Sequence, residues 1–241
     1  MACLIKSAVF KFPHVTLQLA VPKLLPSSGV ATSRFYSSKP RAPVHNDETK
    51  IQKSVFISQS SNIFTNLALE DWLYKNFDFT NHHVMLLWRN NPCVVIGRHQ
   101  NPWQETNLGV LYDEGIEIAR RNSGGGTVYH DSGNLNVTFF TPRERYNRRN
   151  NLEIISRTLE REWNIQTEIN TREDIVYDGK YKISGTAAKL GRPSSYHHCT
   201  LLVNVNKSRL SQSLHHHAVS QTFTIQKTWV RFPAEDSARF S

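Results

Sequence analysis

Hydrophobic positions along this chain of 241 residues follow two periods, one typical of strands and one typical of helices. Short apolar runs at residues 55–57, 84–88 and 93–96 contain mostly branched and aromatic side chains, and such runs predict strands. The last two runs are separated only by the polar residues 89–92, which end in proline. We therefore expect these two strands to form a β-hairpin.

Apolar residues at helical spacing predict three helices. In the first, Leu67 and Tyr74 lie on one stripe. The second follows Asn101, an N-cap residue before Pro102 at the first helical position, and should continue to about Asp113. The third places four apolar residues toward the core, at Leu152, Ile155, Leu159 and Trp163.

Further strands complete an α+β pattern. The dipeptide Asp178-Gly179 is typical of a hairpin turn, and apolar residues flank it on both sides. The helices and strands show no regular βαβ spacing, which favours a largely antiparallel mixed sheet flanked by helices. The remaining strands are expected at residues 116–120, 136–141, 174–177, 181–183 and 196–204.

The N-terminal segment differs in composition from the rest of the chain. Residues 1–46 contain no Asp or Glu but carry scattered Lys, Arg and Ser, a pattern typical of a mitochondrial transit peptide. Residues 34–37 resemble a matrix-protease site with cleavage after Tyr36. We therefore expect a transit peptide at 1–36 and a polar linker at 37–53. A disordered basic tail is the alternative.

Bulk properties exclude several functional classes. The net charge of +9 could steer an acidic protein partner, but no motif of a common nucleic-acid-binding module is present, so nucleic-acid binding is not expected. No stretch approaches the ~18 apolar residues of a membrane span. Three widely spaced cysteines, Cys3, Cys93 and Cys199, form no disulfide framework or zinc pattern.

Three motifs carry the candidate chemistry. Residues 120–131 hold three consecutive glycines, with two arginines before them and Tyr129, His130 and Asp131 after them. Ordered glycines are costly, and a nest of bare N–H groups beside guanidinium charge can bind an anion. Residues 182–189 add two lysines around what we expect to be a small-residue turn. Residues 196–202 change from polar to apolar, as in a strand.

Together with residues 64–71 and 94–103, these motifs closely resemble the lipoate-protein ligase and lipoyltransferase family, its animal mitochondrial members most of all. The resemblance covers residues 54–214 and implies the catalytic-domain fold shared by biotin and lipoate protein ligases. Residues 215–241 carry no family motif, so we expect a shortened catalytic domain followed by a divergent tail.

The resemblance also implies roles for individual residues. Lys182 would be the catalytic residue, placing positive charge where negative charge develops on the phosphoryl and carbonyl oxygens. Contacts to an acyl-adenylate would come from Tyr129, Arg172, Lys182 and Thr200. The lipoyl pocket would be lined by Arg121, Ser123, Gly124, Gly125, Gly126 and His130.

Simpler interpretations of some of these residues stay open. His130, His197 and His198 match no metal-ligand spacing, so no metal site is expected, and each could be a structural histidine. Ser123 has no nearby His/Asp arrangement of the hydrolase kind, so it is not expected to act as a nucleophile. Arg172 could form a surface ion pair with the acids that follow it.

The function that this resemblance implies is lipoyl transfer in the mitochondrial matrix. A lipoyl group would move from lipoyl-AMP, or from the lipoylated glycine-cleavage H protein, to a lysine of lipoyl domains in 2-oxoacid dehydrogenase complexes. We expect a monomer. The alternatives are an ATP- and Mg²⁺-dependent lipoate ligase and a truncated, non-catalytic form that binds lipoyl-adenylate. A biotin-ligase relative is disfavoured because the Gly-Arg-Gly-Arg type of loop is missing.

Overall fold

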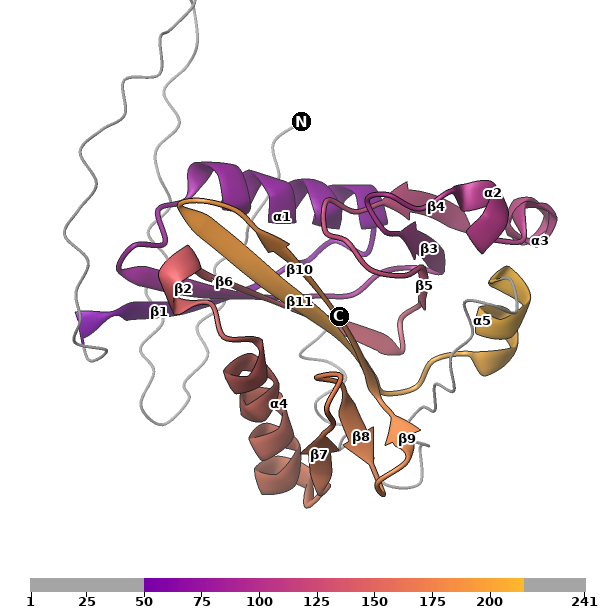
Figure 1. Cartoon of the computed structure of the whole chain (residues 1–241). Coiled ribbons are helices and arrows are strands. Elements are labelled where there is room, and N and C mark those ends of the chain that lie inside the picture. The colour runs from indigo at the N-terminus through magenta and orange to yellow at the C-terminus, as the bar shows by residue number, and fades with distance from the viewer. Residues whose placement is uncertain (1–49, 215–241) are drawn as a thin grey trace, which may run out of the picture.

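A computed structural model describes residues 50–214 of the chain (Figure 1). The predicted transit peptide at 1–36, the tail at 215–241 and the predicted linker up to residue 49 lie outside the described residues. The first strand begins at Gln52, two residues before the predicted start of the catalytic domain.

A five-stranded sheet forms the centre of the molecule, in the order β1-β2-β6-β11-β10. The first pair, β1 and β2, is parallel, and the other three pairs are antiparallel. The two longest strands, β6 and β11, lie next to each other and pair along their whole length. The strands are β1 (Gln52–Ile57), β2 (His82–Trp88), β6 (Asn134–Pro142), β11 (Ser194–Leu202) and β10 (Ser184–Leu190).

Two smaller sheets extend this centre. In the order β4-β3-β5, the first pair is parallel and the second antiparallel, and in β7-β8-β9 both pairs are antiparallel. The α+β class is thus confirmed, with the strands divided among three sheets. The strands are β3 (Cys93–Ile96), β4 (Glu117–Arg120), β5 (Val128–His130), β7 (Thr167–Ile169), β8 (Ile175–Tyr177) and β9 (Tyr181–Lys182).

Helices flank the sheets. In Figure 1, α1 runs along the top of the central sheet, α2 and α3 lie beside β4, and α4 lies next to the small β7-β8-β9 sheet at the bottom. Within residues 50–214, no helix has the length and apolar character needed to cross a membrane. The helices are α1 (Ile63–Asn76), α2 (Pro102–Glu105), α3 (Leu108–Asp113), α4 (Arg148–Trp163) and α5 (Lys207–Ser213), with a 3₁₀ turn at Arg143–Arg145.

Asparagine caps the start of each α-helix. The Asn62 side chain accepts a hydrogen bond from the amide of Thr65, and Asn101 accepts one from Trp103 as predicted. A capping side chain satisfies one of the four amides that a helix start leaves without an intrahelical partner. The sequence therefore fixes these starts locally. The other caps are Asn107, Asn147 and Asn206.

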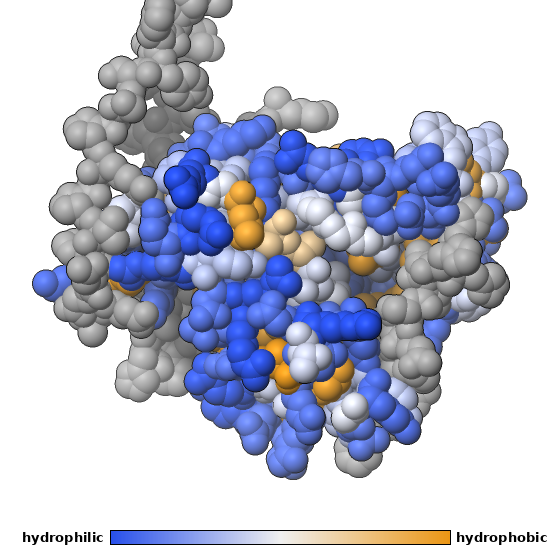
Figure 2. All heavy atoms as spheres, viewed as in Figure 1, coloured by the Kyte–Doolittle hydropathy of each residue, from blue (hydrophilic) through white to orange (hydrophobic). Residues whose placement is uncertain are grey.

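Three apolar clusters form the core. One lies between α1 and the central sheet, and includes Leu86, Phe140 and Tyr196. A second packs α4 and β8 against the opposite side chains of β6 and β11, and a third lies under α3 and α5. The face seen in Figure 2 is mostly hydrophilic, with hydrophobic side chains gathered in small areas.

The predicted hairpin of residues 84–96 is wrong. Strand β2 pairs with β1 and β6, whereas β3 belongs to the other sheet with β4 and β5. The connecting residues do not close a hairpin turn. Asn90 is 1% exposed and bonded within the molecule, and the amide of Asn91 donates to the carbonyl oxygen of Ser61. The chain is thereby directed from one sheet into the next.

Two helix predictions need correction. The helix expected from Pro102 to Asp113 is divided into α2 and α3, because Thr106 pairs with Leu214 in an isolated bridge and Asn107 begins a new helix. Trp163, expected in the core, is 39% exposed at the end of α4. Asn164 ends that helix in the left-handed region, so Ile165 turns back and is buried in its place.

The small-residue turn expected within residues 182–189 is wrong as well. These residues form the end of β9 and most of β10, which pairs with β11 along its whole length. Small side chains do not exclude a strand when a long neighbouring strand supplies the hydrogen bonds. The hairpin that turns at Asp178-Gly179 is confirmed, and both residues have positive φ.

Candidate functional site

The glycine loop, residues 123–127, packs directly against a second loop at residues 97–100. A β-carbon added at Gly97 would lie 2.0 Å from the carbonyl oxygen of Gly125, so only glycine fits there. The Gln100 side chain joins the two loops, because its Oε1 accepts from the amide of Gly97 at 2.9 Å and from the hydroxyl of Thr127 at 2.8 Å. The two loops therefore form one structural unit.

The buried side chain of Arg121 holds this unit by hydrogen bonds. It is 5% exposed, and its Nη2 donates to the carbonyl oxygens of Gly124 at 2.7 Å and Gly126 at 2.6 Å. Burial lowers the pKa of the guanidinium to about 10, so it stays charged at neutral pH. In a trans peptide the N–H points opposite to the C=O. The amides of Gly125 and Thr127 therefore point away from Arg121.

A hydrogen-bonded chain joins Arg121 to a buried carboxylate. Arg121 Nε donates to Ser123 Oγ at 3.0 Å, Ser123 Oγ lies 2.8 Å from His198 Nε2, and His198 Nδ1 lies 2.9 Å from Glu70 Oε1. Arginine only donates, so Ser123 Oγ accepts from Arg121, and the direction of its bond to His198 depends on the tautomer of the imidazole. The chain places a buried cation and a buried anion at opposite ends, which compensates the cost of burying both.

This arrangement corrects the prediction that Ser123 has no hydrolase-like partners. Nothing in the sequence pattern indicates this arrangement, because Glu70 and His198 are 128 residues apart. Ser123 is nevertheless 1% exposed and Glu70 is 2% exposed, so the hydroxyl is enclosed by protein. The three residues serve to hold Arg121 and the glycine loop in place.

His130 lies near the same cluster, on β5. It is 3% exposed, and its ring lies edge to face with Trp88 at a centroid distance of 6.2 Å. Burial first, then the charges of Arg121 and His198, lower its pKa to about 3. His130 is therefore neutral at physiological pH. Its Nδ1 lies 3.0 Å from Asn90 Nδ2.

Lys182 lies at the other end of the site, on β9. Its Nζ forms an ion pair with Asp174 at 2.9 Å, and 30% of the side chain is exposed. Arg172 is exposed in the turn before β8 and forms no ion pair within residues 50–214, because Glu173 pairs with Arg148 and Asp174 with Lys182. The alternative of a surface ion pair for Arg172 is therefore wrong in this conformation.

Thr200 and Tyr129 lie in different surroundings. Thr200 lies opposite Gly185 on the neighbouring strand, and its Oγ1 accepts from the amide of Gly185 at 2.9 Å. Tyr129 points to the other side of β5 from His130, since successive side chains of a strand alternate. It packs in the apolar cluster under α3 and α5, where burial raises its pKa to about 12.

Strand β10 connects the two ends of the site. A β-carbon at Gly125 would lie 3.7 Å from the β-carbon of Ala187, and Ala187 lies opposite His198. Lys182 is five residues earlier on a nearly extended segment, so it is at most about 17 Å from Ala187.

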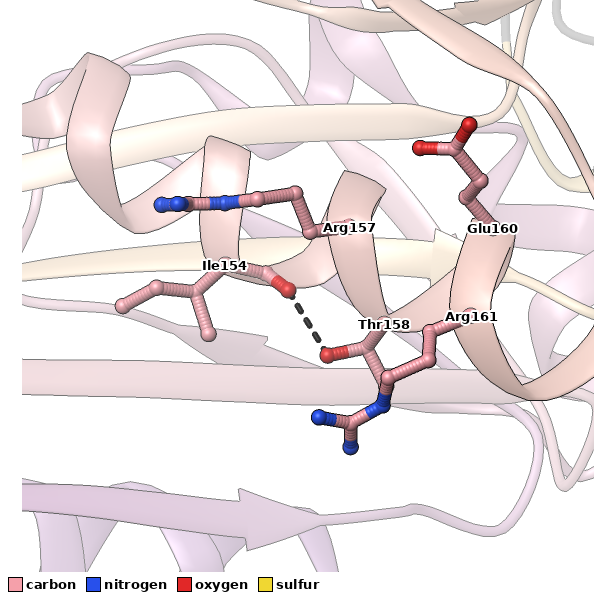
Figure 3. A pocket seen from close by; sticks show the side chains of 5 residues that line it. All are labelled: Ile154, Arg157, Thr158, Glu160 and Arg161. Carbon is pink, nitrogen blue, oxygen red and sulfur yellow. Dashed lines mark hydrogen bonds between the residues drawn. The ribbon is translucent and has the colours of Figure 1, made fainter.

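A further surface feature lies outside the candidate site. A depression on the outer side of α4 is lined by Ile154, Arg157, Thr158, Glu160 and Arg161, all from this one helix (Figure 3). It contains none of the predicted site residues. Within residues 50–214, no group of three or more His, Cys, Asp or Glu side chains is placed to hold a metal ion.

Sequence reasoning missed Asn66, Glu70 and Asn90 as parts of this site. Asn66 is completely buried, and with Glu70 it shares the inner side of α1 between Ile63 and Leu73. Polar residues on the buried stripe of a helix are expensive unless they are bonded, so this spacing is a usable signal. Asn90 was missed because residues 89–92 were interpreted as the turn of a hairpin.

The described residues form an α+β domain with three sheets and flanking helices. The model of the lipoyl protein ligase A/B catalytic domain family matches residues 62–231, and the chain belongs to this family. The match continues past residue 214, the predicted end of the resemblance.

Two curated relatives are the mitochondrial lipoyl amidotransferases of Mus musculus and Homo sapiens. They are 50% identical over 161 residues and 49% identical over 158 residues, and each alignment covers 65% of this chain. The chain spans only 42% of the length of either relative.

Solved structures show the same fold. P. falciparum LipL1, in complex with lipoate, is 36% identical with a TM-score of 0.63, over 67% of this chain and 51% of that one. A bipartite lipoate protein ligase from Thermoplasma acidophilum is 20% identical with a TM-score of 0.65, over 79% of this chain and 80% of that one.

Proposed function

We propose that this chain carries the acyl-transfer chemistry of protein lipoylation in the mitochondrial matrix. It would move a lipoyl group from lipoyl-AMP, or from the lipoylated glycine-cleavage H protein, to a lysine of lipoyl domains in 2-oxoacid dehydrogenase complexes. The observation that carries the proposal is the partly exposed Lys182, which Asp174 holds by an ion pair on the segment that leads into β10, the strand that contacts the glycine loop. The names of the mouse and human relatives support it.

The geometry suggests a role for each end of the site. The acyl tail would lie toward the glycine loop and His130, with its mixed anhydride near Lys182. Asp174 holds the lysine in place, so its ammonium would stabilise charge developing on the carbonyl and phosphoryl oxygens without further rearrangement. Arg172, which has no anionic partner within residues 50–214, would meet the phosphate.

The chemical step itself is an aminolysis. The neutral ε-amine of the acceptor lysine attacks the acyl carbonyl carbon and forms the amide bond. The bond between the acyl carbon and the phosphate oxygen breaks, AMP leaves with the electron pair, and the attacking nitrogen gives its proton to water. Lys182 is the cation in this part of the chain best placed to stabilise the tetrahedral intermediate.

The test supplies the full chain with preformed lipoyl-AMP and an apo-lipoyl domain, and follows the acceptor by intact mass. A lipoyl-sized mass increase is expected, and Lys182→Ala should slow it by about 10²- to 10³-fold. Lys180→Ala is the matched control, since this lysine is two residues away and lies over the ring of Tyr181. Equal rates for both variants would contradict the role of Lys182.

The alternatives are separated by changing the donor. Labelling from lipoate, ATP and Mg²⁺ without preformed lipoyl-AMP would identify a complete ligase. Binding of lipoyl-AMP without transfer would identify a non-catalytic form.

A further inference from the structure

The two most exposed large hydrophobic side chains among residues 50–214 lie on the short helices α2 and α3, at the right of Figure 1. Tyr112 on α3 is 88% exposed, and Trp103 on α2 is 72% exposed. Single exposed apolar residues are normal on a protein surface, but neighbouring large ones often mark a contact surface. This part of the molecule is therefore a candidate for an apolar contact.

The apolar stripe of α3 is only partly covered. Leu108, Leu111 and Tyr112 follow the i, i+3, i+4 spacing that places side chains on one side of a helix. Leu111 is buried in the cluster under α3 and α5, whereas Leu108 and Tyr112 are exposed. Leu111 thus anchors the helix, and the margin of its stripe has no cover within residues 50–214.

The charges beside this stripe are negative. Asp113 and Glu117 are exposed and form no ion pair within the described part of the chain, while Glu114 pairs with Arg209 at 3.2 Å. Interfaces combine an apolar centre with a polar rim, and the charges of the two partners are complementary. An occupant that is both apolar and basic therefore fits this surface.

The last described residues lie beside the same two helices. Leu214 pairs with Thr106 in the isolated bridge, and the amide of Asn107 donates to the carbonyl oxygen of Ser213 at 3.1 Å. Thr106 and Asn107 connect α2 to α3. The segment that follows Leu214 therefore starts next to the exposed stripe.

Residues 219–232 have the composition that fits this surface. They contain six apolar side chains and two cations, and no Asp or Glu occurs between Leu214 and Glu235. The family match extends to residue 231, so it includes most of this segment. The apolar residues are Val219, Phe223, Ile225, Trp229, Val230 and Phe232, and the cations are Lys227 and Arg231.

The covalent connection favours this segment over other occupants. Phe223 is nine residues beyond Leu214, and an extended chain of that length spans up to about 30 Å, whereas the six residues of α3 span about 9 Å. A short connection holds a segment at an effective concentration in the millimolar range. A second copy of the chain, or a separate basic partner, would have to reach the same surface from dilute solution.

We propose that residues 219–232 dock on the exposed side of α2 and α3, which Trp103, Leu108 and Tyr112 form. The apolar side chains of the segment cover these three residues, and its two cations lie near the unpaired carboxylates of this surface. The contact does not depend on the proposed function, so it can be tested without lipoyl-AMP or an acceptor domain.

Photo-crosslinking in the full chain tests the contact directly. A p-benzoylphenylalanine residue takes the place of Tyr112, and the cross-linked peptides are identified by mass spectrometry after irradiation. Cross-links to residues 219–232 of the same chain are expected. The same probe at Trp72, an exposed position on α1, is the control and should give none. Equal yields from the two positions, or cross-links only between chains, would overturn the proposal.

Hydrogen exchange measured by mass spectrometry tests the contact without a probe. Amides of residues 219–232 should exchange about tenfold more slowly in the wild type than in Tyr112→Ser. Trp72→Ser, also at an exposed position, should exchange like the wild type. Asp113→Lys should accelerate exchange more at low salt than at high salt, because salt screens exposed charges. Wild-type exchange of this segment as fast as in Tyr112→Ser would overturn the proposal.

Discussion

The two ends of the candidate site are built in opposite ways. At the glycine-loop end, Arg121, Ser123 and Glu70 are buried and joined by hydrogen bonds, and the loop packs against Gly97. At the other end, Lys182 is partly exposed and held by one ion pair, and Arg172 has no ionic partner within residues 50–214. A fixed end suits a constant acyl tail, and an exposed cationic end suits a charged group that arrives and leaves.

This difference has an energetic origin. A buried charge is stable only when its partners are in place, so removal of one partner is costly. An exposed charge is solvated by water and contributes little to stability, which leaves it available to a ligand. Variants at the glycine-loop end should therefore change mainly the stability of the protein, and variants at the Lys182 end mainly ligand binding and transfer.

The largest effect on stability is expected for Arg121→Met. It removes the charge opposite Glu70 and leaves the carbonyl oxygens of Gly124 and Gly126 without their donor, so the free energy of unfolding should fall by about 3–5 kcal/mol. Urea unfolding measures this free energy. Arg120→Met is the matched control, because Arg120 also donates to three backbone carbonyls but is exposed. Equal losses for the two variants would argue against burial as the cause.

A smaller loss is expected for Gly97→Ala. The added methyl group would lie 2.0 Å from the carbonyl oxygen of Gly125, so the two loops must separate, at a cost of about 1–3 kcal/mol. Lipoate affinity should fall together with stability, as calorimetry would show. Gly124→Ala provides the control, since nothing lies within 4 Å of the added carbon there. Wild-type affinity in Gly97→Ala would show that the loop contact does not shape the site.

The buried histidines predict a pH dependence of stability. His130 and His197 have pKa values of about 3 in the folded protein and near 6.5 when unfolded, so the unfolded state binds more protons between these values. Stability should therefore fall as pH decreases below 6.5, by roughly 1.4 kcal/mol per pH unit for each histidine. His197→Phe should flatten the slope by that amount in urea unfolding at several pH values. His99→Phe, at an exposed position, is the control and should leave the slope unchanged. A similar flattening in both variants would show that burial of His197 is not the cause.

The smallest effect on stability is expected for Arg172→Gln, within about 0.5 kcal/mol. Its effect should be on the ligand instead, with lipoyl-AMP bound about tenfold more weakly because a charged contact to the phosphate is lost. Free lipoate, which has no phosphate, should bind as in the wild type. A loss for both ligands would place Arg172 at the carboxyl group rather than at the phosphate.

Local signals in the sequence predicted part of this structure well. The cap at Asn101 and the turn at Asp178-Gly179 depend on neighbours in the chain, and both were confirmed. The glycine run was also recognised, although the sequence could not show that Gly97 lies against Gly125.

What the sequence could not predict depends on contacts between distant segments. The course of residues 89–92 is set by Asn90, which bonds to a helix residue 24 positions earlier and to a strand residue 40 positions later. Strand β10 is set by its pairing with β11, not by its own small side chains. The chain from Ser123 to Glu70 joins three separate motifs, so only the folded structure reveals it.

The central claim is that one end of the site holds the acyl tail and the other performs the transfer. The most direct test measures single-turnover transfer from lipoyl-AMP to an apo-lipoyl domain as a function of lipoyl-AMP concentration, for Lys182→Ala and His130→Phe. The two-ended site predicts that Lys182→Ala lowers the rate at saturation and changes half-saturation little, whereas His130→Phe raises half-saturation and leaves the saturated rate near wild type. The reverse pattern, or the same loss of saturated rate in both variants, would contradict it.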